Sequence, residues 1–250
     1  PNSGVTSLDL NSKDNSLKVK RYYVFNLNNQ KKALKGGYEN VIAIGAPFLY
    51  IKNPKQYYSK EISNSLITFP SHTHEYGGFK DTYKTYKNYL ESLKKIKNKF
   101  SLVVVSLGWA EYKNSNIVKL FENEGIPVVC MGHRDKNPNF LIKFINEVSK
   151  FEYVSSDNVS SAVFYSLYMR KKVFLYGRLM TANNIWHIDN IKRELIDDNS
   201  LYTQLFWNNF DHKSHFHIAD KELGVDQIRT PKELCEIFGW NIKTTFKNKI

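Results

Sequence analysis

The chain has 250 residues, of which 42% are hydrophobic and 14% aromatic; this excludes a disordered protein and is enough for a substantial core. Its two cysteines, Cys130 and Cys235, are too few for a disulfide framework and lack metal-type spacing, so they fit a reducing compartment. No apolar run reaches the length that spans a bilayer and no secretory signal is visible, so we expect a cytoplasmic protein.

The formal net charge of +12 comes mostly from lysine. A solvated lysine surface is one explanation. The other is attraction to polyanions, such as nucleotide phosphates, an anionic membrane surface or an acidic polysaccharide. Because the chain shows no zinc finger, no RNP-type pattern and no helix-turn-helix spacing, we expect no nucleic-acid partner.

The first part of the chain predicts one strand–helix–strand unit and a connector. Residues 1–20 are polar and predict a loop, and residues 21–38 predict a strand, a turn and a short helix that ends at Gly36. A buried strand follows within residues 40–51, and a lysine- and tyrosine-rich connector spans about residues 52–63.

Strands and helices then alternate regularly. Residues 101–109 are almost continuously apolar, which is typical of a strand buried on both faces of a sheet. This alternation predicts an α/β fold with a Rossmann-like parallel sheet and right-handed crossovers. The predicted strands are 65–72, 101–109, 126–133, a short strand from Tyr153 and 172–177, and the predicted helices are 81–100, 116–125, 137–151 and one after Ser160. Beyond residue 178 the chain is mostly helical, with a short helix from Pro231 to Gly239.

Polar residues follow the predicted strands at their carboxyl ends. In an open α/β sheet these ends meet at one edge, where the ligand normally binds. The residues at this edge are Ser71, His72, His74 and Glu75 after the first strand of the series, Trp109 and Glu111 after the second, His133 and Arg134 after the third, and a group of serines after the fourth.

The serines form the most informative group. Ser155, Ser156, Ser160 and Ser161 surround a predicted helix start. A helix N-terminus carries about half a positive charge and several unpaired donors, so it suits a phosphate. The alternative is that Ser160 or Asp157 only caps the helix.

The histidines and acids of this edge also leave alternatives open. His72 and His74 could form a metal pair, although side chains two apart in an extended segment point to opposite faces; they could equally be surface residues or catalytic ones. Glu75 could be a solvated acid or a catalytic base. His133 and Arg134 could begin a polar loop, or they could clamp a phosphate.

The order of segments NVIAIGAPFLY, ITFPSHTHEY, VVCMGHRDKNPNF and YVSSDNVSSAVFYSLYMRKKVFLYG, closed by PKELCEIFGW, resembles bacterial GT-B-type glycosyltransferases of surface-polysaccharide synthesis. The resemblance covers about residues 20–240. It implies that residues 1–62 are part of an acceptor-side Rossmann-like domain with its linker and that residues 63–180 bind the nucleotide sugar. Residues 181–250 would be a helical C-terminal extension that braces this domain or crosses back.

The serine-rich turn also resembles the serine motif of bacterial sialyltransferases and of Kdo- and polyol-phosphate-transferring relatives. This resemblance implies that Ser160 and Ser161 hold the donor phosphate, with Ser155 and Ser156 as further candidates. His133 stands where those sialyltransferases carry a histidine, although theirs is followed by proline and His133 by Arg134.

The expected function is metal-independent transfer of a sugar from a nucleotide-activated donor, with a CMP-linked sugar as one candidate, to a saccharide or lipid-linked saccharide. We expect no cofactor and no bound metal. His72, His74 or Glu75 would act as base; His133, Arg134 and the serines would bind the donor. The basic surface would favour peripheral contact with the inner face of a bacterial membrane. Two other functions stay open, a CDP-polyol phosphotransferase and a non-catalytic polyanion-binding α/β protein.

Overall fold

The computed structural model describes residues 21–72, 82–177, 205 and 215–240. The chain forms two compact units: unit 1 comprises Pro1–Ile51 with Asp220–Ile250, and unit 2 comprises Lys52–Ala219. The division expected from the sequence, with boundaries after residues 62 and 180, differs from this one. The reason is that the last helices pack with the first strands of the chain, a long-range contact that no local pattern reveals.

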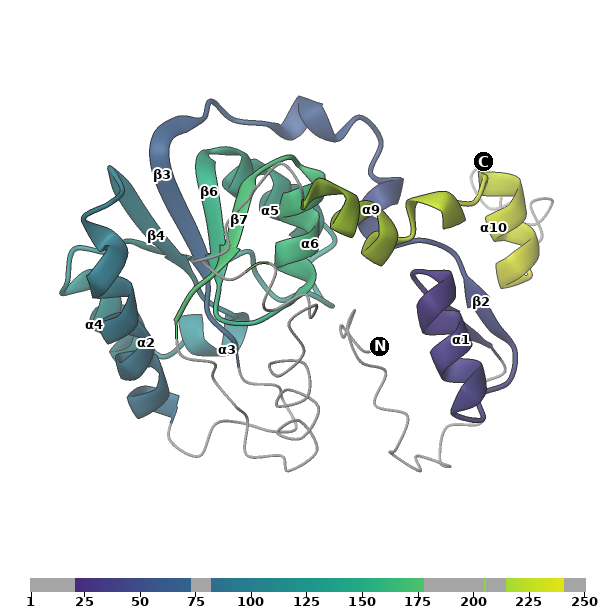
Figure 1. Ribbon diagram of the computed structural model, residues 1–250, viewed down its shortest axis with the longest axis horizontal. Coiled ribbons are helices and arrows are strands. Elements are labelled where there is room, and N and C mark those ends of the chain that lie inside the picture. The colour runs from purple at the N-terminus through teal and green to yellow at the C-terminus, as the bar shows by residue number, and fades with distance from the viewer. Residues whose placement is uncertain (1–20, 73–81, 178–204, 206–214, 241–250) are drawn as a thin grey trace, which may run out of the picture. The chain divides into compact units, whose positions relative to one another are not determined.

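Unit 1 is a small α/β unit (Figure 1). Its two strands, β1 (Tyr22–Val24) and β2 (Val41–Ala43), pair in parallel, and α1 (Leu27–Lys35) connects them. The side chain of Asn26 caps α1 by accepting a hydrogen bond from the backbone nitrogen of Asn29, and the helix ends at Gly36 as predicted.

The end of the chain completes unit 1. The second half of α9 (Phe216–Leu223) lies beside the segment after β2, where the backbone nitrogen of Ala46 donates to the carbonyl of Leu223 at 2.8 Å. Arg229 donates from Nη2 to the carbonyl of Ala43 at 3.0 Å. The last helix, α10 (Pro231–Phe238), begins in a capping box and ends at Gly239, whose φ is 69°, so the predicted helix is confirmed.

Unit 2 holds a five-stranded sheet, and every pair of neighbouring strands in it is parallel. The α/β class and the parallel sheet are therefore confirmed. The strand order is β5-β4-β3-β6-β7, which is the order of a doubly wound, Rossmann-like sheet. The strands are β3 (Ile62–Phe69), β4 (Leu102–Ser106), β5 (Val128–Val129), β6 (Phe151–Ser156) and β7 (Lys172–Leu175).

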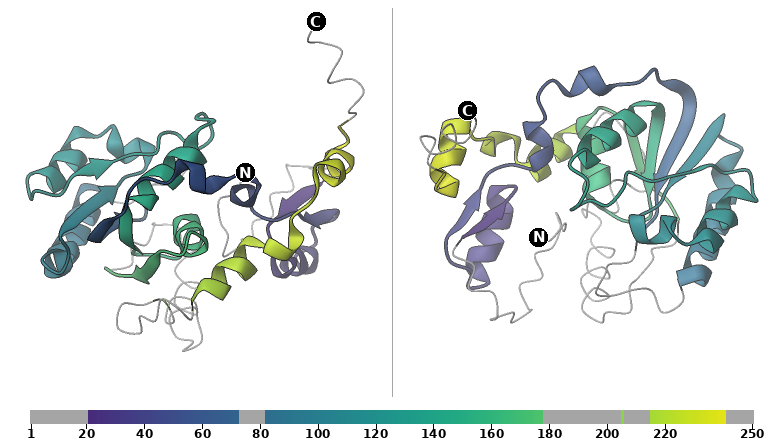
Figure 2. Two further views of the ribbon diagram at one scale, coloured as in Figure 1. Left: turned by 90° about the horizontal axis from the view of Figure 1, so that it is seen from above. Right: turned by 180° about the vertical axis from the view of Figure 1, so that it is seen from behind.

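Helices cover both faces of this sheet (Figures 1 and 2). On one face, Leu66 of β3 belongs to the same buried cluster as Leu90 and Phe121 from the covering helices. On the other face, the rings of Phe69 and Phe144 lie 5.6 Å apart. The first pair of helices is α2 (Thr82–Lys97) and α4 (Ser115–Glu122), the second is α5 (Phe140–Ser149) and α6 (Ser161–Tyr168), and a short α3 (Trp109–Tyr112) follows β4.

The predicted elements of unit 2 are present, with shifted ends. β5 has only 2 residues. The helix expected from residue 137 begins at Phe140, with Asn139 as its N-cap. In the described parts of the chain, no helix combines the length and the hydropathy needed to cross a membrane.

Candidate functional site

The strand order reverses at β3, because the chain adds β4 and β5 on one side of β3 and then returns to add β6 and β7 on its other side. This reversal creates a switch point in the sheet. β4 pairs with one side of β3, and β6 pairs with the other. In doubly wound sheets, the crevice beyond the carboxyl ends of such neighbouring strands is where ligands bind. The residues at these ends are Ser71 and His72 after β3, Gly108 and Glu111 after β4, and Asp157 after β6.

A hydrogen-bond network ties the two strand ends together. Asp157 is fully buried, and its Oδ1 accepts from the backbone nitrogen of Ser71 at 2.7 Å and from the Ser71 hydroxyl at 2.9 Å. The hydroxyl of Tyr86 on α2 donates to the carbonyl of Ser71 at 2.9 Å. Three polar atoms of Ser71 are thus engaged, so the position of its neighbour His72 is well defined.

A negative electrostatic field surrounds the buried phenol of Tyr86. Its pKa is raised well above the ordinary value of 10.0, first by burial and then by the charges of Glu111 and Asp157. Glu111 is 2% exposed and Asp157 is fully buried, so both carboxylates act through an interior of low polarity. The β4–β3–β6 part of the edge therefore carries two buried acids.

His72 is exposed and lies against the start of α3. A β-carbon built on Gly108 would come within 2.9 Å of His72 Cβ and within 2.6 Å of Glu111 Oε2. The imidazole-bearing residue and the buried carboxylate therefore approach the same face of one glycine.

The structure separates the four predicted serines into two pairs. Ser155 and Ser156 are buried in β6. The Ser155 hydroxyl bonds to Thr68 Oγ1 at 2.6 Å, and the Ser156 hydroxyl donates to the carbonyl of Phe69 at 2.7 Å. These hydroxyls hold β6 to β3, an arrangement that suits a structural role better than a phosphate contact.

Ser160 and Ser161 lie at the start of α6, as expected. Ser160 is the N-cap residue, and its side chain makes no capping hydrogen bond. Ser161 is the first helical residue, and its hydroxyl is hydrogen-bonded to Tyr165. Burial raises the pKa of Tyr165 to about 12, and the bond to Ser161 and the charge of Arg134 oppose this rise. The charge of the Arg134 guanidinium thus reaches Tyr165 in α6.

His133 and Arg134 lie in the turn before α5. Arg134 Nε pairs with Asp135 Oδ1 at 3.0 Å, with both side chains exposed to solvent. The backbone nitrogen of Asp135 donates to His133 Nδ1 at 3.2 Å, which leaves Nε2 as the other polar atom of that ring. Of the predicted pair, Arg134 is thus exposed, and its charge reaches Tyr165 of α6.

Two of the predicted base residues, His74 and Glu75, fall outside the described residues. Conversely, the sequence did not single out Tyr86, and it offered Asp157 only as a helix cap. The sequence carries one signal for Asp157, because this acid directly follows the last two residues of a strand. The structure then shows that these two residues are buried and that Asp157 faces the loop after the neighbouring strand. Tyr86 occupies an apolar helix position, and nothing in the pattern separates it from the other core tyrosines.

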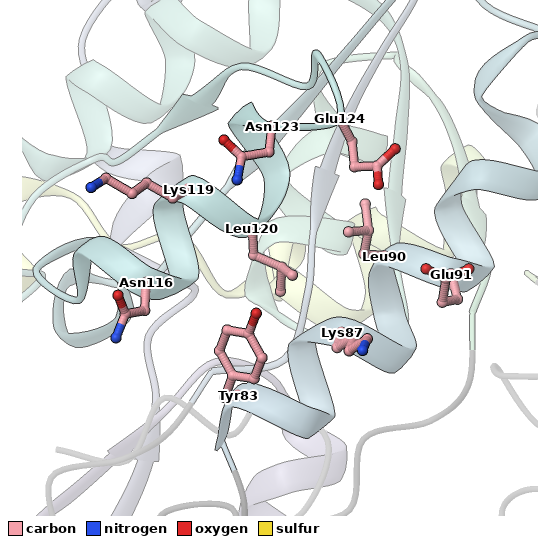
Figure 3. Close-up of a pocket in the computed structure, with 9 residues that line it drawn as sticks. All are labelled: Tyr83, Lys87, Leu90, Glu91, Asn116, Lys119, Leu120, Asn123 and Glu124. Atoms are coloured by element: carbon pink, nitrogen blue, oxygen red, sulfur yellow. The ribbon is translucent and has the colours of Figure 1, made fainter.

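A surface groove of about 630 Å³ lies between α2 and α4 (Figure 3). Leu90 and Lys87 from α2 and Leu120 and Lys119 from α4 are among the residues that line it (Figure 3). It contains none of the predicted site residues, so it is separate from the switch point.

No protein-family model matches the chain, and no curated protein matches its sequence. Within the described residues, no three His, Cys, Asp or Glu side chains gather as a metal site would require. The site is thus defined by its geometry: two buried acids and His72 on one part of the edge, and a helix start with Arg134 on another.

Proposed function

We propose that the protein transfers a sugar from a nucleotide-activated donor to a saccharide or lipid-linked saccharide. The observation that carries the proposal is the separation of charge along the carboxyl edge of the sheet. Glu111 and Asp157 make one part negative, while another part holds the N-terminus of α6 and the Arg134 guanidinium, which also pairs with Asp135. Such an edge matches a reaction in which opposite charges develop on the two halves of one substrate.

Glycosyl transfer is a reaction of this kind. In its transition state the sugar becomes oxocarbenium-like and positive, while the departing phosphate becomes more negative. Preorganised groups of opposite sign at both places stabilise that state. In this proposal Ser160, Ser161, His133 and Arg134 hold the phosphate, and the two buried acids act on the sugar through their charge, from inside the edge of the sheet.

The chemical step needs a base for the acceptor hydroxyl. The acceptor oxygen bonds to the anomeric carbon, its proton passes to the base, and the bond between that carbon and the phosphate oxygen breaks with both electrons leaving on the nucleotide. Among the three predicted bases, His72 is the one that the structure describes, and its exposed side chain is accessible to an acceptor.

The two α/β units also fit the two-domain plan of a GT-B enzyme, with unit 2 as the nucleotide-binding domain. The net charge of +12 would help to hold an anionic acceptor at a membrane face. A CDP-polyol phosphotransferase fits the edge less well. There the attacked centre is itself an anionic phosphate, which two buried carboxylates would repel.

A thermal-shift screen with CMP, CDP, UDP, GDP and dTDP, without added metal, tests the proposal first. We expect one nucleotide to raise the melting temperature by several degrees. The double variant Ser161→Ala, His133→Ala should abolish most of this rise, whereas Ser92→Ala on α2, whose hydroxyl donates to a carbonyl of its own helix, should not. No response to any nucleotide would overturn the proposal, and steeply salt-dependent binding of acidic polysaccharide would then favour the binding-protein alternative.

Product analysis separates the two transferase reactions. A glycosidic bond between donor sugar and acceptor is expected. A phosphodiester bond in the product would instead identify a phosphotransferase.

A further inference from the structure

The turn that joins β4 to α3 brings a histidine and a buried acid to one glycine. Gly108 has φ −63° and ψ 160°, a conformation open to any residue, so its backbone does not require glycine. The surrounding side chains do require glycine, because a β-carbon at this position would lie 2.6 Å from Glu111 Oε2, 2.9 Å from His72 Cβ and 3.2 Å from His72 Cγ. The missing side chain at position 108 leaves a space that both Glu111 and His72 border.

Glu111 is an unusual residue to bury. It is 2% exposed on a helix of only 4 residues, and burial of a carboxylate is costly unless the charge has a polar partner. Its charge acts on two other side chains. It is one of the causes that raise the pKa of Tyr86 and the pKa of Cys130, and in both cases the larger cause is burial of the group itself. The carboxylate therefore lies inside the edge of the sheet and on the side where His72 stands.

We propose that Glu111 is a positioning residue for His72. In this role its carboxylate would accept a hydrogen bond from one imidazole nitrogen and so leave the other nitrogen as the acceptor that faces the crevice. A buried acid that orients a histidine in this way selects the tautomer and stabilises the protonated ring during the reaction. The role of His72 as base rests on the proposed function, whereas the Glu111–His72 contact does not.

Other groups near the pair have defined places. Asp157 binds Ser71, the residue before His72, and Tyr86 fixes the carbonyl of Ser71. These contacts hold the main chain that carries the ring. Glu111 is the acid that shares with His72 the space above Gly108. The proposal thus gives Glu111 a different task from Asp157: one orients the imidazole, the other anchors the backbone.

Nitrogen NMR of protein labelled with ¹⁵N-histidine tests the contact without any substrate. The two ring-nitrogen shifts report which nitrogen carries the proton, and the signals that disappear in His72→Gln are assigned to His72. We expect one dominant tautomer for His72 in the native protein and a mixture of both in Glu111→Gln. Glu124→Gln, which alters an exposed acid just after α4, is the matched control and should leave the His72 signals unchanged.

The second readout uses the donor found by the nucleotide screen. Glu111→Gln should lower kcat by about tenfold or more with little change in the donor KM, because base catalysis and not donor binding is impaired. Glu111→Asp, which keeps the charge, should restore part of the rate. Melting curves of both variants show whether the fold is intact.

The outcomes distinguish the two proposals. If the native protein transfers sugar but Glu111→Gln leaves both the His72 signals and kcat unchanged, the positioning role is overturned and the proposed function stands. If no nucleotide binds and no transfer occurs, the proposed function fails. The tautomer shift in Glu111→Gln would then still establish the contact, and its absence would overturn the contact as well.

Discussion

Ser71 donates two hydrogen bonds to a single carboxylate oxygen of Asp157, one from its backbone nitrogen at 2.7 Å and one from its hydroxyl at 2.9 Å. The contact joins the end of β3 to the end of β6, the two neighbouring strands between which the strand order reverses. Because Asp157 is fully buried, this link is protected from water and sets the relative position of the two loops that leave the strands.

Replacing Asp157 should therefore destabilise the protein. Asp157→Ala leaves two donors of Ser71 without their acceptor, and we expect the free energy of unfolding to fall by about 2–4 kcal/mol. Asp157→Asn keeps an acceptor oxygen and should cost less. Urea unfolding followed by circular dichroism measures both. Asp135→Ala removes an exposed acid and should change the midpoint little; an equal loss in that control would refute the special role of Asp157.

Two helix caps of the chain should respond differently to the same substitution. Thr230 Oγ1 accepts from the backbone nitrogen of Glu233 at 3.3 Å in a capping box, so Thr230→Ala should cost about 1 kcal/mol and speed amide exchange in α10. The Ser160 side chain makes no such bond. Ser160→Ala should leave amide exchange in α6 nearly unchanged and instead weaken nucleotide binding by about tenfold.

Hydrogen exchange with mass spectrometry and nucleotide titration measure the two effects separately. Faster exchange in α6 with unchanged nucleotide affinity would show that Ser160 is only a structural cap.

A methyl group at position 108 should push neighbouring side chains out of place. Gly108→Ala places a carbon 2.6 Å from Glu111 Oε2 and 2.9 Å from His72 Cβ, so at least one of the two residues must move. We expect a lower melting temperature and loss of sugar transfer, with nucleotide binding largely kept. Gly36→Ala is the matched control, because Gly36 has a negative φ of −80° and is exposed. Full transfer activity in Gly108→Ala would contradict the importance of this contact.

Acid should weaken the protein partly through Glu152. Its pKa is lowered from the ordinary value of 4.5, first by the hydrogen bond from Lys172 at 2.5 Å and then by that from the backbone nitrogen of Asn64 at 2.7 Å. A carboxyl whose pKa is lower in the folded state stabilises the fold above its unfolded pKa. This stabilisation is lost as the pH falls through the lower, folded value.

The variant Glu152→Gln should therefore be less stable than the native protein at about pH 6, and the difference should be smaller at about pH 3. Urea midpoints at the two pH values measure the difference. Glu91→Gln, an exposed acid on α2, should show no comparable change. A gap between native protein and Glu152→Gln that stays constant with pH would count against this origin.

Much of the local structure follows from the sequence. The alternation of apolar strands with amphipathic helices predicts the parallel α/β unit, because side-chain periodicity directly reflects which face is buried. Glycines predict helix ends for the same local reason: Gly125, with a φ of 68°, follows α4, and Gly239 ends α10. Which end of each strand is the carboxyl end also follows from chain direction. The sequence alone therefore predicts that His72, Glu111, His133 and the serines lie at one edge of the sheet.

Only the tertiary structure decided which of these residues share a place. Strand order joins segments far apart in the chain, and it alone makes the ends of β3, β4 and β6 neighbours. It also turns Ser155 into the sheet, toward Thr68, and leaves Ser160 at the helix start. For the same reason, the sequence could not predict that the two acids are buried. Whether Glu111 is solvated or enclosed depends on the side chains that surround it, which are set by packing and not by the pattern of neighbouring residues.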